Sequence, residues 1–394
     1  MTQAHLIELT EYAPAWLAPE TLPKAVGEKL WREYRQQVNV EFPSPITAEQ
    51  WRLTAQGWVG YIPLTPAFHF VLQPKVELAN LFRMLEYAYH LEFERGDGLI
   101  ECRSLLEFYE RLAGLLARRV LERGRKGFYR AYLAETEQLP YLRGRVDLQQ
   151  AARRPGQVKL QCHYQEQTAD IEENQILAWT LWRIARGGLC TERVLPGVRR
   201  AYRALQSLVT LQPFSPAACL QRFYNRLNDD YQPLHALCRF FLEQSGPAHQ
   251  AGDHAMLPFL VDMARLYELF VAEWLKAHLP AGLALKAQER VHLGSTGQLY
   301  FEVDLVLYDL AEGAVRAVLD TKYKRAAQPA AEDIQQMISY AHTKGCSEAV
   351  LIYPERLAQP LDETIRGIRL RSLPFALAGD LEESGRQFLE LLQQ

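Results

Sequence analysis

Two aspartates and a lysine in the last third of the chain have the residue types and the spacing that phosphodiester hydrolysis needs. Asp304 lies in the segment LYFEVDLVLYD, and Asp320 and Lys322 lie in AVRAVLDTKYK. Alternation along a strand places Asp304 opposite the main apolar row of its segment, whereas Asp320 and Lys322, two residues apart, leave their strand on one face. Two adjacent strands therefore bring the three side chains together.

This combination predicts a metal site. Magnesium prefers oxygen ligands such as carboxylates and keeps several waters. A bound metal lowers the pKa of its water and polarises the phosphate, and a lysine beside it offsets the charge that develops in the transition state. We therefore expect Asp304 and Asp320 to bind Mg²⁺, with Mn²⁺ able to substitute.

The pattern D-x-K is weak by itself, because Asp and Lys on an exposed strand face are usually only solvated. Here Asp320 directly follows the apolar run Ala317–Leu319. Burial of a carboxylate is costly unless the group is paired or ligates a metal. A fourth carboxylate comes from the preceding helix, where Glu268 and Glu273 compete; five residues apart, they point in different directions.

The elements that must position these residues form an α/β module over residues 251–394. Apolar spacing predicts, in order, a helix, two strands, a helix and a short buried strand. Their ranges are Met263–Leu279, Gln298–Leu310, Ala314–Lys324, Ala331–Thr343 and Ala349–Tyr353.

The first 250 residues divide into two further regions. Residues 1–95 are β-rich, with two strands and a Pro-containing turn over Trp58–Lys75 and a helix that begins near Val76. Residues 96–250 are mainly helical, with a short strand at Val158–Tyr164. Asp170 and Asn174 are competing caps for the helix that follows. The Gly- and His-containing stretch Ser245–Ala255 is the expected linker to the last domain.

Bulk properties fit a globular cytoplasmic protein. Net charge is −3 and hydrophobic residues make up 48% of the chain, which neither indicates nor excludes a nucleic-acid binder. The six cysteines contain no C-x-x-C pair, and His235, His249 and His254 match no zinc spacing. Five tryptophans are expected in cores rather than stacked on bases: Trp51, Trp58, Trp179, Trp182 and Trp274. No signal peptide or membrane-spanning segment is expected.

The order of these residues resembles the PD-(D/E)XK nuclease superfamily. The matching residues are Glu268, Asp304, Asp320-Thr321-Lys322, and Gln336 with Tyr340 in QQMISYA; Val303 stands where the motif has proline. The resemblance implies that Asp304, Asp320 and the Thr321 carbonyl ligate the metal and that Glu268 holds a metal-bound water. It further implies that Lys322 positions the nucleophile and that Gln336, on one helical face with Tyr340, orients Lys322 or DNA.

More narrowly, the chain resembles the McrC family, the nuclease subunits of modified-DNA restriction systems. The blocks LQPKVELANLFRMLEYA, LRGRVDL, CHYQEQTADIEEN and MARLYELFVAEWL carry this resemblance. It implies a McrB-like AAA+ GTPase ring as partner, engaged by the amino-terminal region, methylated double-stranded DNA as substrate, and pairing of two nuclease domains for double-strand cleavage. The sequence contains no G-x-x-x-x-G-K-[ST] loop, so any nucleotide-driven motor acts in trans.

A cluster of basic residues in the middle region has two interpretations: contact with DNA phosphates or a solvated helix surface. Its members are Arg118, Arg119, Arg123, Arg125, Lys126, Arg143 and Arg145. For the whole chain, the leading hypothesis is a Mg²⁺-dependent DNA endonuclease subunit. The alternatives are a nuclease of another defence or repair system and a non-catalytic activator of an AAA+ ring.

Overall fold

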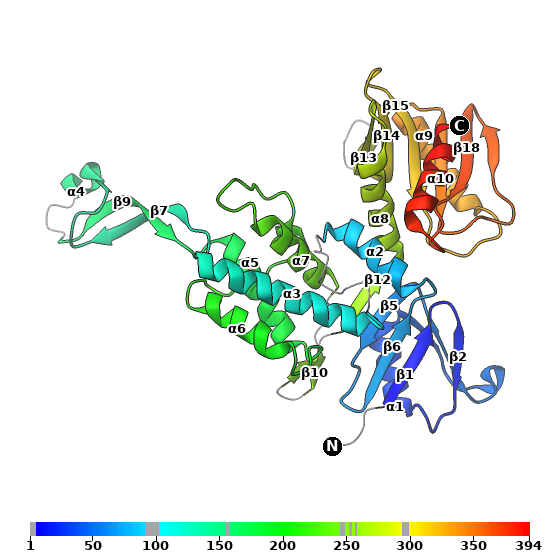
Figure 1. Ribbon diagram of the computed structural model, residues 1–394, viewed down its shortest axis with the longest axis horizontal. Coiled ribbons are helices and arrows are strands. Elements are labelled where there is room, and N and C mark those ends of the chain that lie inside the picture. Colours follow the sequence, from blue (N-terminus) through cyan, green and yellow to red (C-terminus); the bar gives the residue numbers. More distant parts are fainter. Residues whose placement is uncertain are drawn as a thin grey trace. The chain divides into compact units, whose positions relative to one another are not determined.

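The computed structural model describes residues 5–91, 102–153, 158–244, 249–251, 254–256, 258–293 and 299–394 (Figure 1). By contacts, the chain divides into two compact units. Unit 1 comprises residues 1–108, 246–251 and 257–394, and unit 2 comprises residues 109–245 and 252–256. Unit 2 is therefore an insertion in the sequence of unit 1. The three domains expected at 1–95, 96–250 and 251–394 stay a prediction.

The amino-terminal part of unit 1 contains two sheets. A four-stranded sheet has the order β1-β6-β5-β12, and a three-stranded antiparallel sheet has the order β2-β4-β3. The strands are β1 His5–Thr10, β2 Pro14–Leu17, β3 Val38–Glu41, β4 Trp51–Ala55, β5 Trp58–Ile62, β6 Phe68–Gln73 and β12 Phe259–Asp262; the helices are α1 Lys24–Tyr34, the short 3-10 turn η1 Pro45–Thr47, and α2 Leu78–Tyr89. The expected hairpin over Trp58–Lys75 is confirmed as β5 and β6.

One apolar core joins these two sheets, because alternating strand residues point inward. Leu9, Leu53, Phe70 and Trp51 are among its buried members. The last strand, β12, comes from far along the chain and pairs with β5, so the carboxyl-terminal segment completes the amino-terminal sheet.

The carboxyl-terminal part of unit 1 is built on a six-stranded mixed sheet of order β13-β14-β15-β16-β18-β17. Its strands are β13 Leu283–Leu293, β14 Leu299–Asp309, β15 Val315–Thr321, β16 Glu348–Tyr353, β17 Asp362–Ile365 and β18 Ile368–Pro374, and its helices are α8 Met263–His278, α9 Ala331–Lys344 and α10 Leu381–Gln393. The five predicted elements are present in the predicted order, while β13, β17, β18 and α10 were not predicted.

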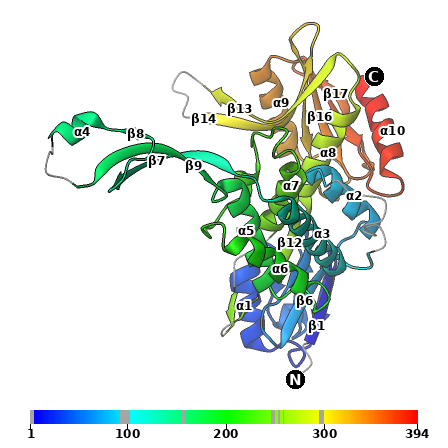
Figure 2. The same ribbon diagram turned by 60° about the vertical axis from the view of Figure 1, so that its left-hand side comes forward.

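Two helical layers cover this sheet. Met337, Tyr340 and Ala341 of α9 pack on the strand residues Val318 and Leu351, and Figures 1 and 2 place α9 and α10 on opposite faces. A Cβ at Gly385 of α10 would lie 2.2 Å from the ring of Trp274 on α8. Glycine at this position therefore permits the close approach of α8 and α10.

Unit 2 combines helices with a long antiparallel ribbon, which extends away from them in Figure 2. The helices are α3 Leu105–Lys126, whose first turn belongs to unit 1, α4 Leu148–Arg153, α5 Glu172–Arg186, α6 Leu195–Gln206, the 3-10 turn η3 Pro216–Cys219 and α7 Tyr231–Glu243. The ribbon consists of β7 Ala131–Leu139, β9 Leu160–Thr168 and the short β8 Arg145–Val146. A two-stranded pair, β10 His249–Ala251 with β11 His254–Met256, has its first strand in unit 1 and its second in unit 2. The strand expected at Val158–Tyr164 extends further, to Thr168. The expected linker falls mostly outside the described residues.

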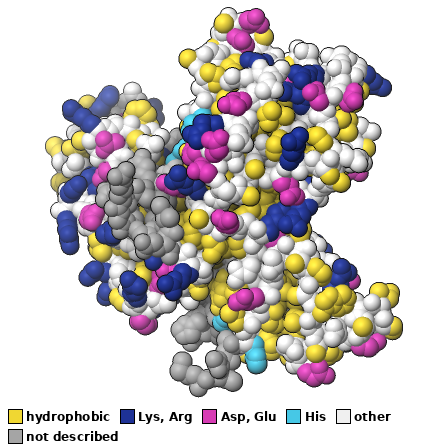
Figure 3. Space-filling model, turned by 45° about the vertical axis from the view of Figure 1, so that its right-hand side comes forward, with side chains coloured by type: hydrophobic (Ala, Val, Ile, Leu, Met, Phe, Trp, Pro, Cys, Tyr) yellow, Lys and Arg dark blue, Asp and Glu magenta, His cyan; other side chains and the backbone are white. Residues whose placement is uncertain are grey.

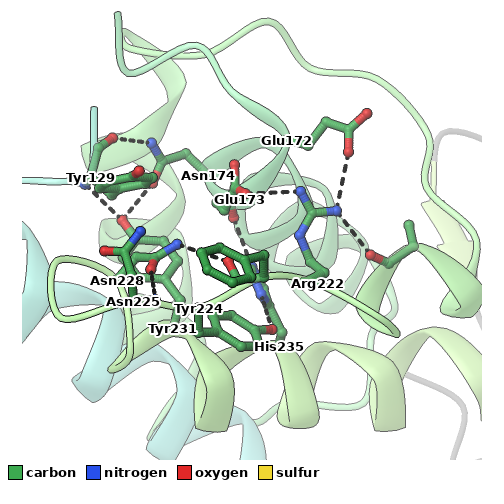
Figure 4. Close-up of polar contacts among 12 residues, drawn as sticks. Tyr129, Glu172, Glu173, Asn174, Arg222, Tyr224, Asn225, Asn228, Tyr231 and His235 are labelled. Carbon is green, nitrogen blue, oxygen red and sulfur yellow. Dashed lines mark hydrogen bonds and ion pairs between the residues drawn. The ribbon is translucent and has the colours of Figure 1, made fainter. Parts of the chain in front are cut away.

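Both capping predictions for α5 were wrong. Ile171 occupies the cap position, and no side chain caps the helix. Asp170 instead accepts hydrogen bonds from the backbone N–H and the hydroxyl of Thr210, at 2.8 and 2.6 Å. Asn174 donates to the carbonyl of Tyr129 and accepts from the hydroxyl of Tyr231 at 2.6 Å (Figure 4). Both side chains form hydrogen bonds with residues from other segments instead of with the backbone N–H groups at the start of α5.

Two further features concern the surface and the thiols. Positive and negative side chains are interspersed on the face shown in Figure 3, in keeping with the net charge of −3. All six cysteines are buried, and none forms a disulfide bond. In the described part of the chain, no helix has both the length and the apolarity needed to cross a membrane.

Candidate active site

The two predicted aspartates lie on neighbouring strands. The antiparallel register pairs Leu305 of β14 with Leu319 of β15, so Asp304 and Asp320 come next in each strand. The backbone N–H of Thr321 donates to Oδ2 of Asp304 at 3.4 Å, and Asp320 is only 1% exposed. The sheet therefore presents two carboxylates side by side at the end of β15.

Lys322 lies one residue beyond β15, and its ammonium group is enclosed by acceptors. Its Nζ is 2.6 Å from Oδ2 of Asp320 and 3.6 Å from Oδ1 of Asp333 on α9. It also donates to Oε1 of Gln336 at 3.4 Å. Asp333 is 8% exposed and forms a second ion pair, at 2.5 Å, with Lys324. The amino-terminal turns of α9 thus hold the lysine against Asp320.

Gln336 and Tyr340 connect this lysine to β14. Nε2 of Gln336 donates to the hydroxyl of Tyr340 at 2.6 Å, and that hydroxyl donates to the carbonyl of Glu302 at 3.2 Å. Glu302 is two residues before Asp304. The expected helical face of Gln336 and Tyr340 therefore points toward the aspartates, and Gln336 accepts a hydrogen bond from Lys322.

Of the two competing helix glutamates, Glu268 faces the aspartates. Its Oε1 accepts from Arg265 at 2.9 Å and from Gln288 of β13 at 3.0 Å, and its charge contributes to the raised pKa values of both aspartates. Glu273 instead contacts His90 at 3.1 Å and Lys276 at 2.6 Å. Gln288 has a left-handed backbone, with φ of 52°.

Burial and mutual repulsion dominate the electrostatics. Burial, with the charges of Asp320 and Glu268, raises the pKa of Asp304 to about 7. Burial also raises the pKa of Asp320, although Lys322 opposes this shift. For Lys322, burial would lower the pKa, but the surrounding aspartates outweigh it and raise the pKa. The ammonium group of Lys322 therefore offsets the negative charges of Asp320, Asp333 and Asp304.

This charge arrangement fits a divalent cation. Oδ2 of Asp320 is buried and accepts no well-formed hydrogen bond, although Lys322 lies 2.6 Å away. An additional positive charge would relieve the repulsion that raises both aspartate pKa values. Among the described residues, no three His, Cys, Asp or Glu side chains form a group that could hold a metal. A two-carboxylate site suits Mg²⁺, which commonly takes one or two protein carboxylates and retains waters.

Asp333, Lys324 and Gln288 were missed by sequence reasoning. A signal existed for Asp333, because it lies three residues before Gln336 and hence on the same side of a helix. Lys324 also had a signal, because it follows Asp320 and Lys322 at the same two-residue spacing, which places side chains on one face of a strand. Gln288 gave no signal, because β13 was not predicted.

The predicted basic cluster lies in unit 2, apart from these residues in sequence. Arg118, Arg119, Arg123, Arg125 and Lys126 are on α3, and Arg143 and Arg145 are at or before β8. Arg123 is paired with Asp230 at 3.4 Å, and Arg143 lies 3.8 Å from the ring centroid of Tyr164. Arg125 lines a hollow of about 570 Å³ together with Arg130 and Arg200.

His235 has a structural environment rather than that of a metal ligand. It is 1% exposed, and its ring nitrogens contact the Tyr224 hydroxyl at 2.8 Å and the Glu173 carbonyl at 3.0 Å (Figure 4). Burial lowers its pKa to about 4. The side chains of His249 and His254 lie outside the described set. Of the five tryptophans expected in cores, two are buried, Trp51 and Trp274, and three are half-buried, Trp58, Trp179 and Trp182.

Comparison with known proteins gives the class first: a component of a DNA restriction system. The model of the family described as "McrBC 5-methylcytosine restriction system component" matches residues 53–354, and the chain belongs to this family. This confirms the resemblance to the McrC family found in the sequence. No curated protein matches the sequence.

Solved structures show a similar fold. One is a chain of the refined half-complex from the tetradecameric assembly of Thermococcus gammatolerans McrB AAA+ hexamers with bound McrC; it has a TM-score of 0.55 and 17% identity and covers 98% of this chain and 100% of that one. Another is a chain of the cryo-EM structure of the Thermococcus gammatolerans McrBC complex, with a TM-score of 0.48, 18% identity, and coverage of 69% and 87%.

Proposed function

We propose that this protein is the Mg²⁺-dependent endonuclease subunit of a McrBC-like restriction system, which hydrolyses phosphodiester bonds in methylated double-stranded DNA. The observation that carries the proposal is the pair of half-buried Asp304 and buried Asp320, with Lys322 between Asp320 and Asp333. Holding two repelling carboxylates together and partly out of water costs stability, so their presence indicates a chemical role.

Each residue has a defined task in this proposal. Asp304, Asp320 and the Thr321 carbonyl hold Mg²⁺, which supplies an activated water and charge stabilisation. Lys322 orients the nucleophile and offsets charge on the phosphate. Glu268 would accept a hydrogen bond from a water molecule held beside Asp304 and Asp320. Asp333 and Gln336 fix the ammonium of Lys322, and Tyr340 fixes Gln336.

The order of elements supports assignment to the PD-(D/E)XK superfamily. Glu268 lies on α8, Asp304 on β14, Asp320 on β15 and Gln336 on α9, which is the order that the sequence motif implies. β15 and β16 are parallel and are joined through α9.

The partner follows from family membership. McrB AAA+ hexamers accompany bound McrC in the similar structure, and we propose a McrB-like GTPase ring for this chain, engaged through its amino-terminal region. The basic residues of unit 2 would contact DNA phosphates. Two copies of the nuclease site would cut the two strands.

The test is reconstitution with the McrB-like protein, Mg²⁺, GTP and DNA with or without methylation. Asp320→Ala and Lys322→Ala should abolish cleavage while retaining ring binding and GTPase stimulation. Asp362→Ala is the control, because it removes an exposed aspartate of the same sheet, paired with Arg369, and should cut normally. Normal cleavage by Asp320→Ala or Lys322→Ala would overturn the proposal. GTPase stimulation without any cleavage by the wild type would instead indicate a non-catalytic activator.

A further inference from the structure

A second buried group of charged residues lies beside the active site and has no part in the proposed chemistry. Tyr323, directly after Lys322, is 5% exposed, and Glu11, at the end of β1, is 3% exposed. The Tyr323 hydroxyl donates to Oε2 of Glu11 at 3.0 Å, and the backbone N–H of Lys75 donates to the same oxygen at 3.3 Å. We call Glu11, Lys75 and Tyr323 the clasp.

The ammonium group of Lys75 completes the clasp. It lies 4.5 Å from the ring centroid of Tyr323 and 5.0 Å from that of Tyr12, within the range of a cation–π interaction. Among the described residues, this Nζ and Oε1 of Glu11 are buried without a hydrogen-bond partner. A buried pair of this kind contributes little net stability compared with apolar packing. Its contribution is instead to hold Glu11, Lys75 and Tyr323 in a single geometry.

On its other side, Tyr323 packs against the element that carries Glu268. The ring centroids of Tyr323 and Tyr267 are 5.9 Å apart, and the Tyr267 hydroxyl donates to the Phe375 carbonyl at 3.2 Å. Tyr267 directly precedes Glu268. Tyr267 and Tyr323 are therefore in contact, and each is next in sequence to a residue of the active site.

The backbone links the clasp to the catalytic lysine over a single residue. The N–H of Lys322 donates to the Ile352 carbonyl at 2.8 Å, and the N–H of Lys324 donates to the Lys322 carbonyl at 2.9 Å, which closes a tight turn centred on Tyr323. A shift of Tyr323 therefore displaces the lysine whose Nζ lies 2.6 Å from Asp320.

We propose that Glu11 and Lys75 of the amino-terminal sheets are positioning residues that act through Tyr323 to align Lys322, so that displacement of those sheets changes the rate of cleavage. This rests on the proposed function, in which the amino-terminal region engages the ring. Binding of the ring to the amino-terminal region would then change the position of Lys322 through the clasp.

The first test measures cleavage by the full chain with its McrB-like ring, Mg²⁺ and GTP. Tyr323→Phe and Lys75→Met should lower kcat about tenfold, as expected for loss of a hydrogen bond to a charged group, and leave KM for DNA unchanged. Lys75→Arg, which retains the cation over the rings, should restore most of the rate. Tyr87→Phe is the matched control, because it removes another tyrosine–glutamate bond within unit 1, of 2.6 Å to Glu382 on α10, and should leave kcat within about twofold of wild type.

The second test requires no nuclease activity. Hydrogen exchange of metal-free full-length protein should be about tenfold faster in peptides covering residues 318–326 for Tyr323→Phe and Lys75→Met, but unchanged for Tyr87→Phe. Equal exchange in all variants, or equal kcat of wild type and clasp variants, would overturn the inference. If the wild type fails to cleave DNA, the proposed function fails, and the exchange data still decide whether the clasp orders the segment after β15.

Discussion

Replacing Asp304 by asparagine should stabilise the metal-free protein at alkaline pH. Its carboxyl group has its pKa raised from 3.8 to about 7 by burial, by Asp320 and by Glu268. Since the folded-state pKa lies above the unfolded value, stability is fully present below pH 4 and is lost as pH rises through 7. A shift of about three units corresponds to ~4 kcal/mol. Sharing of the shift with the neighbouring aspartate and partial access to solvent reduce this to about 2 kcal/mol.

The assay is thermal unfolding in EDTA at pH 8.5 and pH 5. A gain of about 2 kcal/mol corresponds to a rise in Tm of about 5 °C for a unit of this size. Asp304→Asn should show this rise at pH 8.5 and less than half of it at pH 5, where the folded wild-type carboxyl group is neutral but the unfolded one is already ionised. Adding Mg²⁺ should raise the Tm of wild type at pH 8.5 and leave that of Asp304→Asn unchanged.

Two results would refute the reasoning. One is a Tm of Asp304→Asn at or below wild type at pH 8.5; the other is the same increment at both pH values, which would indicate a packing effect. Asp362→Asn is the control, because Arg369 lowers the pKa of that exposed aspartate, so its replacement should give no rise at pH 8.5.

Three other outcomes are expected. Asp333→Asn should leave Asp320 as the one carboxylate that forms an ion pair with Lys322, so that the ammonium competes more strongly with Mg²⁺, and both the Mg²⁺ affinity in calorimetry and the cleavage rate should fall by roughly tenfold. Gly385→Ala should lose about 1–3 kcal/mol in denaturant unfolding because its Cβ would meet Trp274, whereas Gly197→Ala on α6, with open space around it, should gain up to about 1 kcal/mol. Because the pKa of His235 is lowered from 6.5 to about 4, stability present above pH 6.5 should fall toward pH 4, and His235→Gln should flatten that loss in a pH series of melting curves.

Each of these has a contrary outcome. Unchanged Mg²⁺ affinity in Asp333→Asn would mean that the ammonium does not compete with the metal. Equal effects of the two glycine replacements would contradict the close helix approach. A pH profile of His235→Gln identical to that of wild type would assign acid sensitivity to other groups.

The carboxyl-terminal sheet was predictable where apolar residues follow one another closely, as in the runs Leu305–Leu307 and Ala317–Leu319. The runs through Asp304 and Asp320 are such segments, and both gave strands with the expected faces. β13 escaped prediction because its alternation is interrupted at Gln288, where the backbone is left-handed. β17, with the sequence DETI, is a short polar strand without a pattern to detect.

The site was predictable in its residue types, since the spacing within one strand and one helix determines which side chains share a face. Long-range partners were not. Glu11 and Tyr323 are 312 residues apart, and no local rule pairs them. The failed caps at Asp170 and Asn174 have the same cause, because partners from distant segments, such as Thr210, replaced the local backbone groups.

The pairing of β12 with β5 also bears on how the chain folds during synthesis. Residues 5–73 leave the ribosome long before Phe259–Asp262, the strand that closes their sheet. At roughly 5–20 residues per second, the edge of β5 stays unpaired for tens of seconds, while the inserted unit 2 is synthesised. The nascent amino-terminal sheet therefore has an open edge of the kind that invites wrong strand pairing, and expression yield should depend on chaperones acting in that interval.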